Sequence, residues 1–146
     1  MPALYARSEA QTREIGAALA KTLSPGDVVA LYGGLGMGKT AFVRGLAAGL
    51  GLDEEQVSSP TFALVNEYRG AVTLCHFDMY RIDGEDDLCA TGFFDYLDGR
   101  NILAIEWSEK ILDALPGGAV TVRFSPGEDE DSRVIAIESA EGKGNP

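Results

Sequence analysis

A glycine-rich stretch between a buried strand and a helix constrains this chain more than any other part of the sequence. The letters GGLGMGKT occupy residues 33–40 and follow DVVALY, a continuous apolar run typical of a strand buried on both faces. The segment KTAFVRGLAAGL is helical in composition, and Gly51 is expected to terminate the helix. A strand, a glycine loop and a helix in this order predict an α/β fold with a phosphate-binding turn.

The stretch fits the pattern G-x-x-x-x-G-K-[ST] completely, although a glycine-rich turn with an incidental Lys-Thr is the alternative. Its glycines permit positive φ, so successive backbone N–H groups can turn towards one phosphate. The helix that starts near Lys39 adds unpaired N–H donors and the positive end of its dipole. We expect Lys39 to contact the β- and γ-phosphates and the Thr40 hydroxyl to ligate Mg²⁺. The predicted nucleotide-binding loop consists of Gly33, Gly34, Leu35, Gly36, Met37, Gly38, Lys39, Thr40 and Ala41.

Two carboxylates stand where strand-like segments end. Asp78 closes VTLCHFD and Glu106 closes NILAIE, the cleaner apolar run of the two. We expect one of them to hold Mg²⁺, directly or through water, and the other to orient the water that attacks the phosphate. The sequence does not decide which acid does which, and either one alone could be a solvated carboxylate at a strand end.

Thr61 lies in SSPTF, where Pro60 restricts the preceding residue to extended backbone. A threonine after the first helix of such a unit can sense the γ-phosphate and Mg²⁺, although a loop that simply starts the next strand is the blander interpretation. His76, the only histidine, is expected to be packed and hydrogen-bonded without chemistry of its own. Trp107 either belongs to the core or covers the nucleotide site.

The remaining segments predict a single α/β domain, P-loop NTPase-like, over residues 1–138, and a disordered tail over 139–146. A capping box formed by Ser8 and Gln11 opens a helix that runs to about Leu23. We expect an antiparallel hairpin over 61–78, one or two short helices within 84–97, a strand over 101–107, a short helix over 108–115, and paired strands at 119–124 and 133–139. The fold would be a mixed sheet with a central parallel part, antiparallel hairpins and helices on both faces.

Composition narrows the range of partners. The net charge is −11, from 23 acidic and 12 basic residues, without a basic cluster, which disfavours a protein that binds nucleic acid by itself. No membrane span or export signal is visible, so we expect a cytoplasmic protein with no membrane partner. The two cysteines, Cys75 and Cys89, match no metal-ligand spacing and are expected to be buried free thiols.

Four segments, in this order and at these separations, resemble the TsaE family, formerly known as YjeE: LYGGLGMGKTAFVRGLAAGLG, SSPTFALVNEY, HFDMYR and IEWSEK. The resemblance covers residues 8–125. It implies a small ATPase of tRNA threonylcarbamoyladenosine synthesis that binds ATP and Mg²⁺ and hydrolyses ATP slowly by itself. It also implies the TsaB and TsaD proteins as partners, with tRNA reached only indirectly through them and ATP hydrolysis resetting the assembly between turnovers.

The resemblance also assigns roles to matching positions. It implies Thr40, Asp78 and Glu106 around Mg²⁺, catalytic roles for Lys39, Thr61, Asp78 and Glu106, Trp107 beside the nucleotide, and residues 8–11 near the adenine. Gly34, Met37 and Ala41 stand where the family usually has Asp, Ala and Thr. None of these departures removes a fixed phosphate-binding residue, so we expect ATP binding to be retained. Gly34 should make the empty loop more mobile, at an ordering cost of about 0.5–1 kcal/mol on binding.

Three other readings remain open at this stage. A small-molecule or nucleotide kinase usually needs an arginine-bearing lid, whereas the segment after Asp78 offers Arg81 amid acidic residues. A GTP-dependent switch would need the guanine-reading N-K-x-D, which the sequence lacks, and DMYR is not the D-x-x-G switch. A module that binds ATP to stabilise an assembly without hydrolysing it would look the same in sequence.

Overall fold

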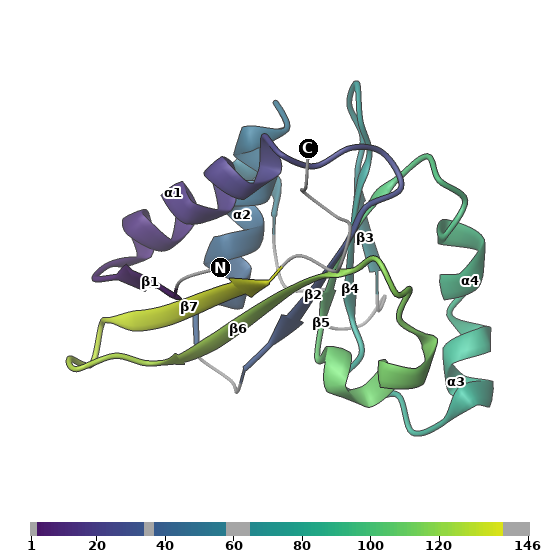
Figure 1. Cartoon of the computed structure of the whole chain (residues 1–146). Coiled ribbons are helices and arrows are strands. Elements are labelled where there is room, and N and C mark those ends of the chain that lie inside the picture. Colours follow the sequence, from purple (N-terminus) through teal and green to yellow (C-terminus); the bar gives the residue numbers. More distant parts are fainter. Residues whose placement is uncertain (1–2, 34–36, 58–64, 139–146) are drawn as a thin grey trace.

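A mixed β-sheet organises the chain (Figure 1). The computed structural model describes residues 3–33, 37–57 and 65–138, and in these ranges seven strands pair in the order β1-β7-β6-β2-β5-β4-β3. The strands are β1 (Ala3–Ala6), β2 (Val28–Tyr32), β3 (Val65–Tyr68), β4 (Leu74–Asp78), β5 (Ile102–Glu106), β6 (Val120–Pro126) and β7 (Arg133–Glu138). The central β6, β2, β5 and β4 are parallel; β7 and β3 pair antiparallel to β6 and β4, and β1 pairs antiparallel to β7. The predicted mixed sheet with a central parallel part is confirmed.

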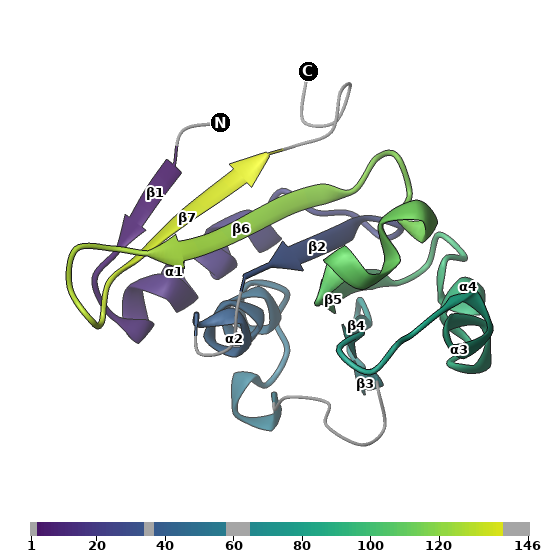
Figure 2. The same ribbon diagram turned by 90° about the horizontal axis from the view of Figure 1, so that it is seen from below.

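Helices cover both faces of the sheet, as predicted (Figures 1 and 2). On one face lie α1 (Glu9–Ala20) and α2 (Lys39–Gly49), followed by the short 3-10 helix η1 (Glu54–Gln56). On the other lie α3 (Glu85–Ala90), α4 (Phe93–Tyr96) and the 3-10 segment η2 (Ser108–Ala114). None of the described helices is both long and apolar enough to cross a membrane.

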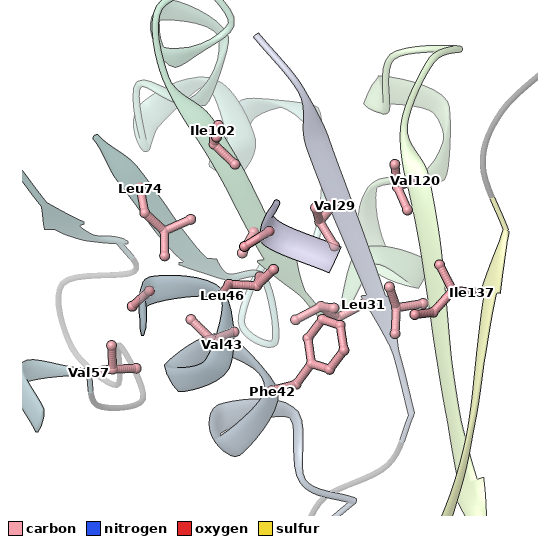
Figure 3. Close-up of a cluster of buried hydrophobic side chains, with 14 of the residues drawn as sticks. Val29, Leu31, Phe42, Val43, Leu46, Val57, Leu74, Ile102, Val120 and Ile137 are labelled. Atoms are coloured by element: carbon pink, nitrogen blue, oxygen red, sulfur yellow. The ribbon is translucent and has the colours of Figure 1, made fainter. Parts of the chain in front are cut away.

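The alternation of strand side chains divides the core into two layers. Val29 and Leu31 of β2 point to the α1–α2 face, where Figure 3 shows them against Phe42 and Leu46 of α2. Val28 of the same strand packs in the opposite layer with the α3–α4 side. Burial of each large side chain contributes about 1.5–3 kcal/mol, so both layers are needed to hold the sheet.

The first helix begins where the sequence predicts it and ends earlier. The Gln11 backbone N–H donates to Ser8 Oγ at 3.1 Å, while Gln11 Oε1 accepts from the Arg7 N–H at 2.7 Å. In a regular capping box the Gln11 side chain would bond to the backbone N–H of Ser8, the N-cap residue. Here it bonds to the N–H of the preceding residue, Arg7. The helix ends at Ala20, and a tighter turn, with the Leu23 N–H bonded to the Ala20 carbonyl, replaces the predicted last turn.

The structure corrects three other expectations. The edge strand β1 was not predicted, and it is built by antiparallel pairing with β7 at the far end of the chain. The predicted helix over 108–115 is a 3-10 segment that is kinked at Ile111. Cys75 is a buried free thiol as expected, but Cys89 is exposed. The hairpin β3–β4 and the paired strands β6 and β7 are confirmed within the described residues, and the predicted disordered tail lies outside them.

Glycines let α1 and α2 approach each other closely. A Cβ atom at Gly16 would collide with the Phe42 carbonyl oxygen, and one at Gly45 with the Arg13 carbonyl oxygen. A Cβ at Gly49 would lie 2.6 Å from the Ala17 carbonyl oxygen. The two backbones therefore touch where larger residues would hold them apart, and this contact fixes the position of the N-terminus of α2.

We predict that Gly45→Ala destabilises the fold by about 1–3 kcal/mol, because the added methyl must push the α1 backbone away and disturb the packing beneath it. Chemical unfolding monitored by circular dichroism measures the change. Gly118→Ala is the control, because a Cβ there meets nothing within 4 Å. Equal stability of the two variants would contradict the close contact between α1 and α2.

Candidate nucleotide-binding site

The predicted site residues meet at the carboxyl edge of the parallel strands. The glycine loop leaves the end of β2, Asp78 ends β4 and Glu106 ends β5. The register pairs Asp78 directly with Glu106, so the two acids lie side by side. Ligands of open α/β sheets bind outside this edge. Here the ends of three adjacent strands place the glycine loop and the two carboxylates there.

Both fixed glycines of the loop have the backbone conformation that the motif requires. Gly33 has φ +147° and Gly38 has φ +94°, where side chains are strained. A Cβ at Gly33 would also lie 3.0 Å from the Phe124 Cβ. Gly38 caps α2, so the N–H groups at the start of this helix are unpaired by any side-chain cap and face the site. The predictions for Gly34, Leu35, Gly36 and Thr61 lie outside the described residues.

The Lys39 ammonium group lies against the start of the loop. It is buried and donates a hydrogen bond of 2.6 Å to the Gly33 carbonyl oxygen. It also lies 4.3 Å from the centroid of the Trp107 ring, a cation–π contact. On nucleotide binding, the ammonium group could exchange its hydrogen bond with the Gly33 carbonyl for bonds to phosphate oxygens.

Trp107 contacts both the site and the hydrophobic core. It has φ +58°, and in the described part of the chain it is the only non-glycine residue with positive φ. Such backbone strain is concentrated at functional sites. Its ring packs against Tyr80 at 4.9 Å between centroids and against the α3–α4 layer below. Trp107 directly follows Glu106 in the sequence, and its strained backbone places the indole ring against the Lys39 ammonium group.

The two acids have different surroundings. Asp78 is half-buried, and this burial raises its pKa, as does the neighbouring Glu106 carboxylate; a 2.9 Å hydrogen bond from the Tyr80 N–H opposes the shift. Glu106 is 5% exposed, and its Oε2 lies 2.5 Å from His76 Nε2. His76 is fully buried and hydrogen-bonded, which confirms the structural part of its prediction.

A pocket of about 690 Å³ joins these groups. Of the predicted residues, it is lined by residues 37–41, Asp78, Glu106 and Trp107, and Ser8 of the proposed adenine segment lies in its wall. The volume suits a nucleotide-sized ligand.

Glu9 of the proposed adenine segment also lines the pocket, together with five residues that the sequence analysis did not single out: Arg7, Thr12, Arg44, Asp131 and Arg133. With Lys39 they place four cationic side chains in one pocket of a chain that has 12 lysines and arginines in all and a net charge of −11. Four carboxylates, those of Glu9, Asp78, Glu106 and Asp131, line the same pocket, so its charges are mixed and suit a ligand that carries both phosphates and a divalent cation. No local sequence motif marks Arg7, Asp131 and Arg133, because the pairing of Ala6 in β1 with Arg133 in β7 is what brings them together.

The donor set suits a metal ion that arrives with phosphates. Among the described residues, no group of three or more His, Cys, Asp or Glu side chains has the arrangement to hold a metal. Mg²⁺ commonly binds through one or two carboxylates or hydroxyls together with substrate phosphates and water. Thr40, Asp78 and Glu106 line one pocket and fit this mode of binding.

Comparisons with known proteins agree on one family. The model of the family "Threonylcarbamoyl adenosine biosynthesis protein TsaE" matches residues 6–135. The chain is 41% identical over 116 residues to the tRNA threonylcarbamoyladenosine biosynthesis protein TsaE of Treponema pallidum (strain Nichols), covering 80% of this chain and 85% of that protein. The protein of the same name from Bacillus subtilis (strain 168) is 36% identical over 126 residues, with 85% and 77% covered. The crystal structure of Bacillus subtilis YdiB superposes with a TM-score of 0.76 at 30% identity and covers 95% of this chain and 85% of that chain.

We predict that Asp78→Asn stabilises the nucleotide- and Mg²⁺-free protein at neutral pH. Because the pKa of Asp78 is raised on folding, the folded chain holds this proton more tightly than the unfolded chain. Stability is therefore lost as the pH rises from the ordinary aspartate range through the raised pKa. Asparagine stays neutral and keeps an oxygen for the Tyr80 N–H, so the variant should melt at a higher temperature than wild type at pH 7, with a smaller difference at pH 4.

Thermal unfolding at the two pH values measures this difference. Asp113→Asn, on an exposed residue at the end of η2, is the matched control and should not change the pH dependence. A variant of Asp78 that melts below wild type at pH 7 would contradict the unfavourable ionisation of this carboxyl group.

Proposed function

Since the chain belongs to the TsaE family and has a role in tRNA threonylcarbamoyladenosine biosynthesis, we propose that it binds ATP with Mg²⁺ and hydrolyses ATP slowly. One observation carries this proposal: the glycine loop with Lys39 opens into the same pocket as the paired acids Asp78 and Glu106. Phosphate binding needs the first group and hydrolysis needs the second.

In this proposal the loop and the start of α2 bind the triphosphate. Backbone N–H groups around Gly38 and at the N-terminus of α2 bind phosphate oxygens. Lys39 leaves the Gly33 carbonyl and contacts the β- and γ-phosphates, and the indole of Trp107 shields it from water. Arg7, Arg44 and Arg133 supply further positive charge along the pocket wall.

The acids act on the metal and on water. Mg²⁺, when bound, neutralises charge on the β- and γ-phosphates and orients them. Thr40 and Asp78 would hold it, directly or through water, and its charge would relieve the repulsion between Asp78 and Glu106. Glu106, buried beside the pocket, would orient the attacking water and accept its proton. We assign these two roles from burial. The half-buried Asp78 suits a hydrated ion, and the more enclosed Glu106 suits a single water molecule.

Partners follow from the family and from charge. We propose that the protein acts with the TsaB and TsaD proteins and that ATP hydrolysis resets their assembly between turnovers. A chain with net charge −11 is poorly suited to hold tRNA by itself, so tRNA would be bound by the partners.

We predict that two substitutions separate binding from hydrolysis. Lys39→Ala should weaken ATP binding by roughly 10–100-fold, because it removes charge-assisted hydrogen bonds to phosphate. Glu106→Gln should lower the rate of phosphate release by roughly 100-fold or more and change ATP affinity by less than about threefold. Calorimetric titration with ATP and a phosphate-release assay measure the two quantities, and Glu138→Gln, at the exposed end of β7, is the control.

The same assays decide among the alternatives. An unchanged rate in Glu106→Gln would show that the role of this acid is wrong, and ATP binding without release of phosphate by wild type would favour an assembly module that does not hydrolyse. Phosphorylation of a nucleoside or small metabolite faster than the release of free phosphate would indicate a kinase. Co-purification with TsaB and TsaD that does not depend on ATP would contradict the proposed role of the nucleotide.

We predict that ATP with Mg²⁺ changes the fluorescence of Trp107, the only tryptophan of the chain. Lys39 lies over its ring and should move towards the phosphates on binding. Titration should give tighter binding for ATP than for GTP. Tighter binding of GTP would contradict the ATPase assignment, and an emission that ATP leaves unchanged at saturation would contradict the proposed movement of Lys39.

A further inference from the structure

His76 is a buried polar group that the proposed reaction does not yet use. Its side chain is fully enclosed, and Nε2 lies 2.5 Å from Oε2 of Glu106. Nδ1 has no hydrogen-bond partner among the described residues, so the contact with Glu106 is the polar contact that the structure gives this ring.

The strand register creates this contact. His76 and Asp78 lie on one face of β4, and their direct partners in β5 are Ala104 and Glu106. On the β5 side, the side chain opposite His76 is therefore a methyl group, which leaves room for the imidazole to extend along the strand to Glu106. The contact joins neighbouring positions on one face of two adjacent strands, and both strands are fixed by the central sheet.

Fold stability alone is a poor explanation for a histidine here. Leu74 precedes it on the same face and Ile102 and Ala104 lie beside it on β5, all fully buried, while the half-buried Asn66 is its partner in β3. An apolar side chain would fill such a position without desolvating an imidazole whose Nδ1 finds no partner in the described part of the chain. The ring does satisfy one oxygen of a buried carboxylate that ends in the nucleotide pocket.

We propose that His76 is a positioning residue for Glu106. It binds Oε2 and thereby fixes the rotation of the carboxylate, so that Oε1 is presented to the water that attacks the γ-phosphate. The role depends on a hydrogen bond at Nε2 and requires no change in the charge of the ring. It rests on the proposed ATPase function and adds to it a residue that lies beneath the site and touches neither nucleotide nor metal.

Two substitutions test the position of the bond. Glutamine places an amide N–H close to the position of Nε2, whereas asparagine places one close to Nδ1 and falls short of Glu106. His76→Asn should lower the maximal rate of phosphate release roughly 10–100-fold, as expected for loss of a residue that orients a catalytic ligand. ATP affinity should change by less than about threefold, and His76→Gln should recover the rate to within about fivefold of wild type.

A structural role would give a different pattern. Equal rates in His76→Asn and wild type, equal losses in the two variants, or a loss of ATP affinity as large as the loss of rate would each overturn the proposal. Melting temperatures of both variants show whether a lower rate reflects unfolding. If it does, the NMR measurement described next tests the proposal instead.

The second measurement needs no substitution of the histidine. Because His76 is the only histidine, a tag-free chain labelled with ¹⁵N-histidine gives one imidazole spectrum. The Nε2 proton should resonate far downfield, should lose this shift in Glu106→Ala, and should keep it with ATP and Mg²⁺ bound. A shift that is absent from wild type, or that disappears on ATP binding, would overturn the proposal. Failure of wild type to hydrolyse ATP would instead contradict the proposed function and leave the His76–Glu106 contact visible in this spectrum.

Discussion

The parallel pairing of β4 with β5 is the constraint on which the site depends. Its register pairs Asp78 with Glu106. His76 lies two residues before Asp78, on the same face of β4. The pairing of β5 with β2 then brings the glycine loop to the same edge. The glycine loop, Asp78 and Glu106 are far apart in the chain and share one pocket because three strands run in one direction, and His76 lies beneath that pocket.

This arrangement is electrostatically unfavourable until a ligand arrives. Two neighbouring carboxylates repel each other, and burial raises the pKa of Asp78. Lys39 is buried with a carbonyl and an indole ring as partners, and Trp107 has a strained backbone. The close glycine contact between α1 and α2 and the apolar layers beneath hold these groups in place. Such a site lowers the stability of the ligand-free protein, and a ligand that carries both phosphates and a divalent cation should stabilise it most.

Much of this could be predicted from the sequence because the signals are local. Continuous apolar runs mark β2 and β5, the glycine pattern marks the loop, and Asp78 and Glu106 stand directly at strand ends. The family resemblance placed Trp107 at the site, and the structure adds that its ring packs on Lys39.

The parts that could not be predicted depend on contacts between distant segments. The short strand β1 has no pattern of its own and forms only through pairing with β7, so Arg7, Asp131 and Arg133 were missed together. The contact of His76 with Glu106 requires the strand register, which the sequence does not give. The kink in η2 and the exposure of Cys89 are likewise outcomes of tertiary packing.

Phosphorus NMR of ATP incubated with the purified wild-type chain tests the central claim most directly, because one spectrum reports binding, hydrolysis and phosphoryl transfer. Broadened ATP signals, followed by slow, Mg²⁺-dependent appearance of ADP and inorganic phosphate in equal amounts, are the predicted result. ATP signals that the protein leaves unchanged, or a new phosphoester in place of inorganic phosphate, would contradict it.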